Sequence, residues 1–468
     1  MYNAAASPVP AVHFTHGSNR IHFSIMNIVK KPFTVFLLTL LILFNASLIE
    51  AQQKTDSTDK KQSTITFEML REIVREIDKR VQSARERGNK LTEIDAIRAL
   101  ETEYAAKGPA AQMAIANWML TVSPEVGNYR EALRYADVIQ SNQPPEQTNS
   151  AVGLEGYKPI DAARAIAHVA RNARVMMINE AHHVPQHRAF TIELLKTLRK
   201  NGFTHFAAET LYEADTKLSE RGYPTKQTGY YTAEPVYGDL VRTALKLGYQ
   251  IVAYEPPYKD ADQRERDQAR NLFERALKDN PKAKLLVHAG YSHIDESGMK
   301  TGAITMAQRF KELTRIDPFT IDQTAMTERS AEKYEHALYR LAVRRGLYRS
   351  TVFQNAQGQL WSLDKGTHDV TIFHPRSRYA SGRPTWLRLG GSRRPYLLPK
   401  NICGDATRCL VRARFASESE EAVPVDQLEV ITRLPIPALM LPAGQFVIEV
   451  QNAEGKQITT RRIRAHKS

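Results

Sequence analysis

The chain has 468 residues, of which 25% are charged and 42% are hydrophobic, and its formal net charge at pH 7 is +14. This length and composition exclude a disordered chain and a small disulfide-dependent scaffold, and they predict two or three globular domains. The positive charge is compatible with contact with an anionic cell envelope, and a plain solvated surface is the favoured alternative. Nucleic acid is not expected as a partner because no nucleic-acid-binding motif is present.

The first 51 residues have the pattern of a targeting segment. Lys30 and Lys31 precede an apolar run over residues 33–44, and small and polar residues follow it as far as Ala51. This order is typical of a secretory signal peptide, and the run is short for a membrane span. We therefore expect residues 1–51 to be a signal peptide, with Met26 as an alternative start and a retained signal anchor as the alternative interpretation. A periplasmic or secreted protein follows from the first interpretation.

Residues 52–157 are predicted to form a helical region. Residues 52–62 are polar and typical of a linker, and apolar residues then recur at helical spacing until Gly88. The apolar stripe consists of Phe67, Leu70, Ile73, Val74, Ile77 and Val81. A further helical pair is expected over residues 116–140, and a polar, proline-containing stretch closes the region.

Residues 158–400 are predicted to form an α/β domain, because short apolar runs alternate there with amphipathic helical segments. The expected strands cover residues 174–178, 203–209, 249–257, 283–294 and 315–321, with 369–376 as a further candidate. The expected helices cover residues 185–202, 235–248, 269–280 and 303–314. This alternation indicates a mostly parallel sheet flanked by helices on both faces.

Residues 401–468 are predicted to form a small C-terminal β-sandwich, because their apolar and polar residues alternate with the period of a strand. The two cysteines of the chain, Cys403 and Cys409, lie at the start of this region with Gly404 and Asp405 between them. Their spacing is not that of a metal or redox pair, and glycine and aspartate favour a turn. In an oxidising compartment we expect a local disulfide bond.

Ionisable residues follow the predicted strands of the α/β domain, at the point where each strand ends. They are Glu180, His182 and His183 after the first strand, then Glu209, Glu255, His288 with His293, and His374. The carboxyl ends of parallel strands meet at one edge of the sheet, where open α/β folds bind their ligands. Buried charges are costly unless they pair with each other, a metal or a ligand. The pattern therefore predicts a site at this edge.

The residue types at this predicted site allow two kinds of chemistry. Carboxylates beside imidazoles can act as general acid and base near neutral pH. They can also bind a divalent metal whose bound water becomes the nucleophile. The expected ligands of such a metal are Glu180, His182, Glu209 and His293.

Three motifs of this region resemble those of the haem-binding-uptake/Tiki superfamily. They are the residues Asn179 to His183, the glutamate Glu209 after the second strand, and the GxxH motif from Gly290 to His293. The resemblance covers residues 160–325. The usual first motif has glycine where Asn179 stands, and either His182 or His183 can be the family histidine. The resemblance implies an erythromycin-esterase-like or Tiki-like hydrolase, or a ChaN-like haem or metal binder.

The resemblance to haem binders directs attention to a tyrosine-rich loop beside the predicted site. Haem binders of this group commonly use a tyrosine as axial ligand, and Tyr230 and Tyr231 lie in this loop. His187 lies where the ChaN-like group often has its second histidine. The same loop can instead form an aromatic lid over a hydrolytic cleft, or simply pack against the domain.

We therefore expect an exported hydrolase of an ester, lactone or amide bond in a small molecule or a peptide. Its catalytic residues are expected to be Glu180, His182 or His183, Glu209 and His293, with a divalent metal as an optional cofactor. The alternatives are a non-catalytic periplasmic haem- or metal-binding protein, and an envelope scaffold with a degenerate site.

Overall fold

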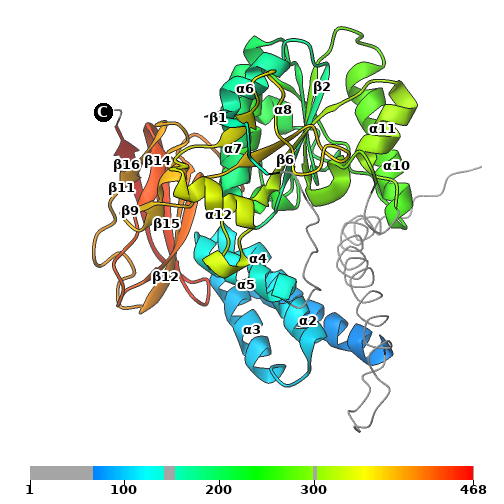
Figure 1. The fold of residues 1–468 in the computed structure, drawn as a ribbon. Helices are drawn as coiled ribbons and strands as arrows, with labels where there is room; N and C mark the ends of the chain where they lie inside the picture. Colours follow the sequence, from blue (N-terminus) through cyan, green and yellow to red (C-terminus); the bar gives the residue numbers. More distant parts are fainter. Residues whose placement is uncertain (1–66, 142–152, 299–302, 467–468) are drawn as a thin grey trace, which may run out of the picture.

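The computed structural model describes residues 67–141, 153–298 and 303–466. The predicted signal peptide and the linker at residues 52–62 lie outside these ranges. Figure 1 shows three parts: a group of helices at the bottom, a helix-covered sheet above it, and antiparallel sheets at the left. In the described part of the chain, no helix combines the length and apolar character needed to cross a membrane.

Four helices form the N-terminal part. Their bounds are α2 Phe67–Arg87, α3 Lys90–Glu103, α4 Pro109–Glu125 and α5 Tyr129–Ser141. Asn89 begins α3 because its side chain accepts hydrogen bonds from the amides of Leu91 and Thr92, forming a capping box. The fully buried side chains of this part pack around Trp118, whose indole N–H donates to Asp78 at 2.8 Å. The same core includes Leu410, so the helices pack against the C-terminal sheet.

An eight-stranded sheet forms the α/β part. Its strands are β1 Lys158–Asp161, β2 Val175–Glu180, β3 His205–Ala208, β4 Gln250–Val252, β5 Leu285–Gly290, β6 Phe319–Met326, β7 Thr351–Gln354 and β8 Val370–Phe373. The strand order is β1-β7-β8-β6-β2-β5-β3-β4. The six strands from β8 to β4 run parallel, while β1 and β7 form an antiparallel edge that the sequence pattern did not indicate.

Helices cover both faces of this sheet. They are α6 Ala162–Val169, α7 Pro185–Lys200, α8 Leu218–Arg221, α9 Pro235–Lys246, α10 Ala261–Leu272, α11 Met306–Thr314 and α12 Ala337–Arg344. Strand β2 shows the alternation, since Met176 and Ile178 join the core under α6, α7 and α9, while Val175 and Met177 join the core under α10 and α11. Burial on both faces explains the continuous apolar strands, and the fold class predicted from the sequence is confirmed.

The helix before β5 differs from its prediction. The sequence predicts a helix over residues 269–280, but α10 begins at Ala261 and a π-helical segment, Phe273–Leu277, continues it. The residues from 261 to 268 are almost all polar or charged, so no apolar period marks them. This extension is important for the site because it carries Arg264 and Glu265, which are buried.

The C-terminal part consists of antiparallel sheets. Its strands are β9 Tyr379–Ala380, β10 Arg383–Pro384, β11 Arg393–Tyr396, β12 Arg408–Phe415, β13 Asp426–Ile431, β14 Leu439–Pro442, β15 Gly444–Asn452 and β16 Gln457–Ala465. A four-stranded sheet, β13-β12-β15-β16, and the pair β11-β14 enclose one apolar core. The predicted disulfide between Cys403 and Cys409 is confirmed, and both cysteines lie in this core.

Polar contacts tie the C-terminal part to the other two. Asn89 donates to the carbonyl of Asn452 at 2.9 Å, which links α3 to the hairpin of β15 and β16. Arg242 of α9 binds both carboxylate oxygens of Glu418, at 2.8 and 2.6 Å. These contacts fix the C-terminal sheet against the helices on one side and against the α/β part on the other.

Strand β5 provides a test of the apolar core on one face of the sheet, because Leu286 belongs to it. Leu286→Ala removes a fully buried side chain and is expected to lower the free energy of unfolding by about 2–5 kcal/mol. The matched control is Leu313→Ala in α11, where the leucine is 53% exposed and the expected change is below about 0.5 kcal/mol. Denaturant unfolding of both variants measures the difference. Equal effects of the two substitutions would contradict the arrangement of this core.

Candidate active site

The order of the strands brings the ends of β2, β3 and β5 together. Glu180 and Gly290 are partners in register, and the amide of Glu209 donates to the carbonyl of His288 at 2.9 Å. The chain then turns abruptly, since Thr210 has φ +63° and Tyr291 has φ +42°. Positive φ angles are unusual for such residues and cluster at functional sites. Backbone strain therefore marks two of the three strand ends that form the site.

Glu180 is the most heavily paired carboxylate of the site and is 1% exposed. Arg188 donates to both of its oxygens at 2.7 Å, His182 Nδ1 donates to Oε1 at 2.9 Å, and His288 Nε2 donates to Oε2 at 2.8 Å. Burial alone would raise the pKa of Glu180, but the charge of Arg188 and the His288 contact outweigh it and hold that pKa well below the usual value. Glu180 is thus an anion at neutral pH.

Arg188 connects Glu180 to a second carboxylate, Glu234. Its Nη1 donates to Glu234 Oε2 at 2.9 Å, and its Nη2 donates to the carbonyl of His182 at 2.9 Å. Glu234 also accepts from the first amides of α9, including that of Tyr237, and so acts as the cap of that helix. A single buried guanidinium therefore fixes the end of β2, the following turn and the start of α9.

A second ionic cluster surrounds Glu209. Arg264 donates to Glu209 Oε1 at 2.7 Å and binds Glu255 at 2.6 and 3.0 Å, and the amide of Gly290 donates to Glu209 Oε2. His293 lies 3.5 Å from Glu209 Oε1 and 2.6 Å from Glu265. Burial and Arg264 lower the pKa of His293, but Glu265 and Glu209 outweigh them and raise it to about 10. The raised pKa favours protonation of His293, and Arg264 Nη1, 2.9 Å from His293 Nε2, opposes it because both atoms would then carry N–H donors.

His182 lies between the two clusters. Its ring stacks on Tyr231, with centroids 4.1 Å apart, and meets the edge of Tyr291 at 5.1 Å. A side chain at position 290 would overlap the ring of His182 and lie 2.8 Å from Glu209 Oε2. Only glycine allows this approach, so Gly290 places the Nε2 side of His182 beside the carboxylate of Glu209.

The structure distinguishes the two adjacent histidines. His182, not His183, contacts Glu180. His183 Nδ1 lies 3.3 Å from the hydroxyl of Tyr291, and burial lowers the pKa of His183 to about 3, so this imidazole is neutral. Of the two adjacent histidines, His182 is therefore the one paired with Glu180.

Two of the expected site residues form a separate, buried pair. His187 Nδ1 accepts from the amide of Ala181 at 3.0 Å, and its Nε2 lies 3.3 Å from Thr327. His374, after β8, lies with its ring centroid 5.0 Å from that of His187, and its Nε2 lies 2.9 Å from Gln323. Because β6 separates β8 from β2, His374 does not reach Glu180. His187 stabilises the turn after β2 by accepting the hydrogen bond from the amide of Ala181.

Asn179 occupies the position of the motif glycine without a left-handed backbone. Its side chain accepts from the amide of Gln323 at 2.8 Å and donates to Asp322 at 3.0 Å and to the carbonyl of Tyr291 at 3.3 Å. The asparagine thus cross-links β2 to β6 and to the turn after β5. The turn that glycine would allow is instead held by side-chain hydrogen bonds.

Four site residues were not singled out from the sequence: Arg188, Glu234, Arg264 and Glu265. Arg264 and Glu265 lie in a highly charged stretch that is typical of a solvated helix face, and Glu234 has the pattern of an ordinary helix cap. The sequence offered one signal for the two arginines: several carboxylates predicted to be buried require buried cations as partners.

The expected metal ligands do not fit a resident divalent metal. Both oxygens of Glu180 accept from Arg188, and Glu209 Oε1 accepts from Arg264. Guanidinium cations at these distances repel a metal ion and occupy its ligands. Within residues 67–466, apart from the undescribed gaps, no group of three or more His, Cys, Asp or Glu side chains has a geometry that could hold a metal.

The residues expected to contact haem fit it poorly as well. His187 is completely buried and both of its ring nitrogens have partners. Tyr231 is covered by His182 on one side, and the ring of Tyr230 lies at its edge with centroids 5.1 Å apart. None of these side chains lies on an open, flat apolar surface against which a haem could bind.

Comparison with known proteins leaves the chain without an assigned family. No model of a known protein family matches it, and no curated protein matches it. Among solved structures, the type III effector HopBA1 shows weak likeness, with 13% identity and a TM-score of 0.29 over 47% of this chain and 95% of that chain. A structure of bacterial protein toxins has 12% identity and a TM-score of 0.29 over 57% of this chain and 68% of that chain. RRSP, a MARTX toxin effector domain from Vibrio vulnificus CMCP6, has 14% identity and a TM-score of 0.26 over 57% of this chain and 66% of that chain. Likeness at this level carries no argument about function.

The contact between Arg188 and Glu180 predicts a large loss of stability when the cation is removed. Arg188→Gln leaves Glu180 and Glu234 buried without their counter-charge, and it is expected to lower the free energy of unfolding by about 3–5 kcal/mol. Arg80→Gln is the control, because its contact with Glu103 is exposed and such pairs contribute about 0–1 kcal/mol. Denaturant unfolding compares the two. A loss below about 1 kcal/mol for Arg188→Gln would mean that the carboxylates do not depend on it.

The raised pKa of His293 predicts a pH-dependent contribution to stability. The folded state binds this proton more tightly than the unfolded chain, so the contribution is complete below pH 6.5 and is lost as pH rises towards about 10. The difference in melting temperature between the native chain and His293→Gln should therefore be largest at pH 6.5 or below and shrink towards pH 10. Replacement of the exposed His168 by glutamine serves as control. A difference that grows with pH would contradict the raised pKa of His293.

Proposed function

We propose that this protein is an exported hydrolase that cleaves an ester, lactone or amide bond in a small molecule or a peptide. The observation that carries the proposal is the pair of Glu180 and His182. A buried carboxylate holds Nδ1–H of the imidazole at 2.9 Å, which leaves Nε2 with its lone pair directed away from Glu180. This is the arrangement of an orienting carboxylate and a general base.

In the proposed mechanism, His182 Nε2 takes a proton from a water molecule as that water attacks the carbonyl carbon. Glu180 stabilises the imidazolium that forms, and it does so without becoming protonated because Arg188 and His288 keep its pKa low. The proton on His182 then passes to the leaving oxygen or nitrogen. The turn of β2 into α7 positions the base, since Arg188 also binds the carbonyl of His182.

The cluster around Glu209 supplies positive charge on the other side of His182. Arg264 carries this charge, and its Nη1 donates to His293 Nε2 at 2.9 Å, a contact in which that ring nitrogen is the acceptor. A cation fixed beside a reacting carbonyl stabilises the oxyanion of a tetrahedral intermediate, and in a largely buried site its effect is strong. The role of Glu209 is to hold Arg264 in place beside His293.

The tyrosine-rich loop provides the surface on which a substrate would lie. Tyr231 stacks on His182, and Tyr291 from the opposite side of the site is 43% exposed. His182 and His293 are also partly exposed, at 13% and 12% of their side chains, so solvent reaches both. Aromatic side chains beside a base favour a substrate with an apolar or ring-shaped part.

Two further observations support export and hydrolysis. The Cys403–Cys409 disulfide is compatible with an oxidising compartment, which agrees with the signal peptide predicted at residues 1–51. Glu180, His182, Glu209 and His293, on which the resemblance to the haem-binding-uptake/Tiki superfamily rests, lie near one another, and this supports the hydrolase that the resemblance implies.

Hydrolysis by purified protein tests the proposal. A panel of nitrophenyl esters, lactones and peptide amides first identifies a substrate, and kcat/KM is then compared among variants. His182→Ala and Glu180→Gln are each expected to lower kcat/KM by about 10²–10⁴-fold, the usual contribution of a general base. His168→Ala, at an exposed histidine of α6, is the matched control and should retain full activity.

Two outcomes would overturn this assignment. Activity that survives in both His182→Ala and Glu180→Gln, with the variants folded, would remove the proposed base. Loss of activity in His183→Ala together with full activity in His182→Ala would transfer the role to the neighbouring imidazole, against the observed contact with Glu180.

A further inference from the structure

The face of the C-terminal sheet opposite its apolar core carries a cluster of arginines. Arg414 lies opposite Val447, which lies opposite Arg462, and Gln445 lies opposite Arg464. Residues paired in this way project from the same side of a sheet, as do residues two apart in one strand. The arginine face is therefore made of Arg412 and Arg414 from β12 and Arg462 and Arg464 from β16.

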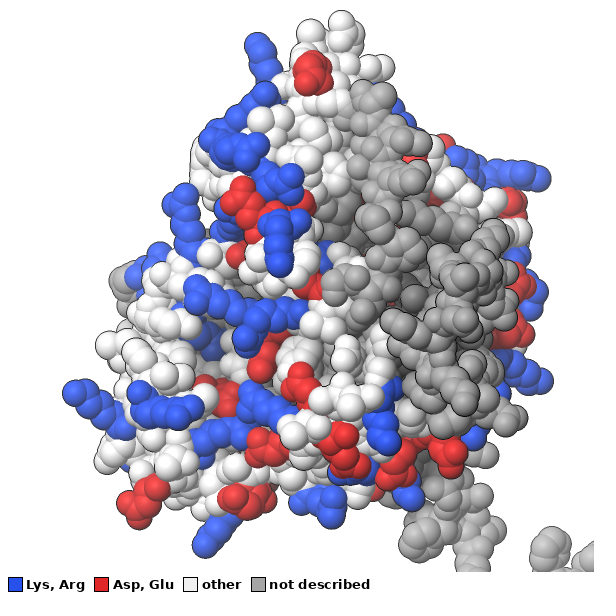
Figure 2. All heavy atoms as spheres, turned by 60° about the horizontal axis from the view of Figure 1, so that its bottom comes forward, with Lys and Arg blue, Asp and Glu red and all other residues white. Residues whose placement is uncertain are grey.

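Positive charge on the arginine face exceeds negative charge. Glu449 is the carboxylate within these rows, and it is shared by Arg414 at 3.1 Å and Arg412 at 3.7 Å. Arg462 and Arg464 are exposed, and their side chains form no ion pair within the described part of the chain. Figure 2 shows Lys and Arg side chains gathered at the left, the side on which the C-terminal sheets lie in Figure 1.

The positive charge extends towards the loop that carries Tyr231. Burial lowers the pKa of Arg412, Glu449 and Glu421 oppose this effect, and repulsion from Arg414 adds to it. Burial is also the largest cause of the lowered pKa of Lys226, which lies in that loop; Arg412 and Lys90 add to it, and Glu421 and Glu125 oppose it. Arg412 and Lys226 therefore lie among carboxylates as well as cations, and the unpaired positive charge of this face is that of Arg462 and Arg464.

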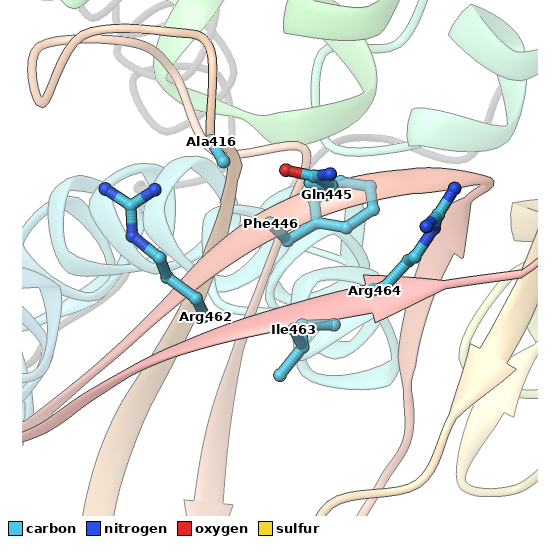
Figure 3. Close-up of a pocket in the computed structure, with 6 residues that line it drawn as sticks. All are labelled: Ala416, Gln445, Phe446, Arg462, Ile463 and Arg464. Atoms are coloured by element: carbon cyan, nitrogen blue, oxygen red, sulfur yellow. The ribbon is translucent and has the colours of Figure 1, made fainter.

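A hollow of about 280 Å³ opens on this face. It is lined by Ala416, Gln445, Phe446, Arg462, Ile463 and Arg464. Figure 3 shows Arg462 and Arg464 rising from the same side of β16, with the amide of Gln445 between them. The hollow therefore combines two unpaired guanidinium groups, one amide donor and an apolar base.

We propose that this hollow is a binding site for a phosphate-bearing ligand. Guanidinium groups donate paired hydrogen bonds that match the oxygens of a phosphate, and Arg462 and Arg464 flank the amide of Gln445 at this hollow (Figure 3). Arg462 and Arg464 have no carboxylate partner within the described part of the chain, so a multiply charged phosphate neutralises their charge better than a single carboxylate does. The proposal is independent of the hydrolase proposal, because no residue of the Glu180 site contributes to it.

Binding of inorganic pyrophosphate to the full chain tests the site. Isothermal titration at about 0.15 M salt, where weak surface attraction is screened, should show saturable binding. Arg462→Gln/Arg464→Gln should weaken this binding at least about tenfold, which corresponds to the loss of about 1.4 kcal/mol. Arg461→Gln is the matched control, because Arg461 lies opposite Ile448 and projects from the other side of β16. The control should change binding by less than about twofold.

A second pair of variants and a lipid arm complete the experiment. Arg462→Lys/Arg464→Lys keeps the charge and removes the forked donors, and it should also weaken binding about tenfold. Co-sedimentation with phosphatidylglycerol vesicles that is lost in the glutamine variant would identify a lipid headgroup as the source of the phosphate. Pyrophosphate binding without vesicle binding would identify a soluble phosphate compound. Absence of saturable binding, or equal weakening by Arg461→Gln, would overturn the site.

Discussion

The burial of Glu180 beneath Arg188 is the constraint on which the site depends. An ionised carboxylate at the end of a central strand is stable only if a cation and further donors replace the water it has lost. The chain supplies that cation locally, because Pro185 starts α7 directly after the turn and Arg188 lies in the first turn of the helix. The same guanidinium binds the carbonyl of His182, so the pairing that makes the buried charge tolerable also positions the imidazole. The contacts of Arg188 therefore both stabilise the buried carboxylate of Glu180 and orient the imidazole of His182.

The second cluster follows the same rule with a different geometry. Residues 210–216, which follow Glu209, include no lysine or arginine, and Arg264 instead reaches Glu209 from α10, which follows β4. That helix ends in a π-helical segment, and its charged first turns face the site. Gly290 then closes the distance between the clusters, since any side chain there would displace His182. The site thus has two carboxylates at strand ends, Glu180 and Glu209, each with its own arginine, and the imidazole of His182 lies between them.

The sequence predicted the layers of the fold and the carboxyl edge of its sheet, because both follow from local patterns. Apolar strands and amphipathic helices have characteristic periods, and Glu180, Glu209 and His293 each follow an apolar run. The sequence did not predict Arg264 or Glu265, since a buried ion pair on a helix has the same local pattern as a solvated one. The edge strands β1 and β7 were also missed, because β1 is four residues long and carries no apolar run. His374 was wrongly grouped with the site because strand order, which sets distance along the edge, cannot be read from local periodicity.

The helical and C-terminal parts contribute to the site through the loop that carries Tyr231. The amide of Val423 donates to the carbonyl of Pro224, and the amide of Ser419 donates to the hydroxyl of Tyr223, so the C-terminal part holds the start of this loop. From the helical part, the charge of Arg85 acts on Tyr230 and opposes the rise in its pKa that burial causes. The α/β part thus supplies His182 and Arg264, while all three parts fix the aromatic side chains beside them. For the hydrolase proposed above, the appended parts would govern which molecule fits against His182, and the sheet edge would supply the catalytic groups.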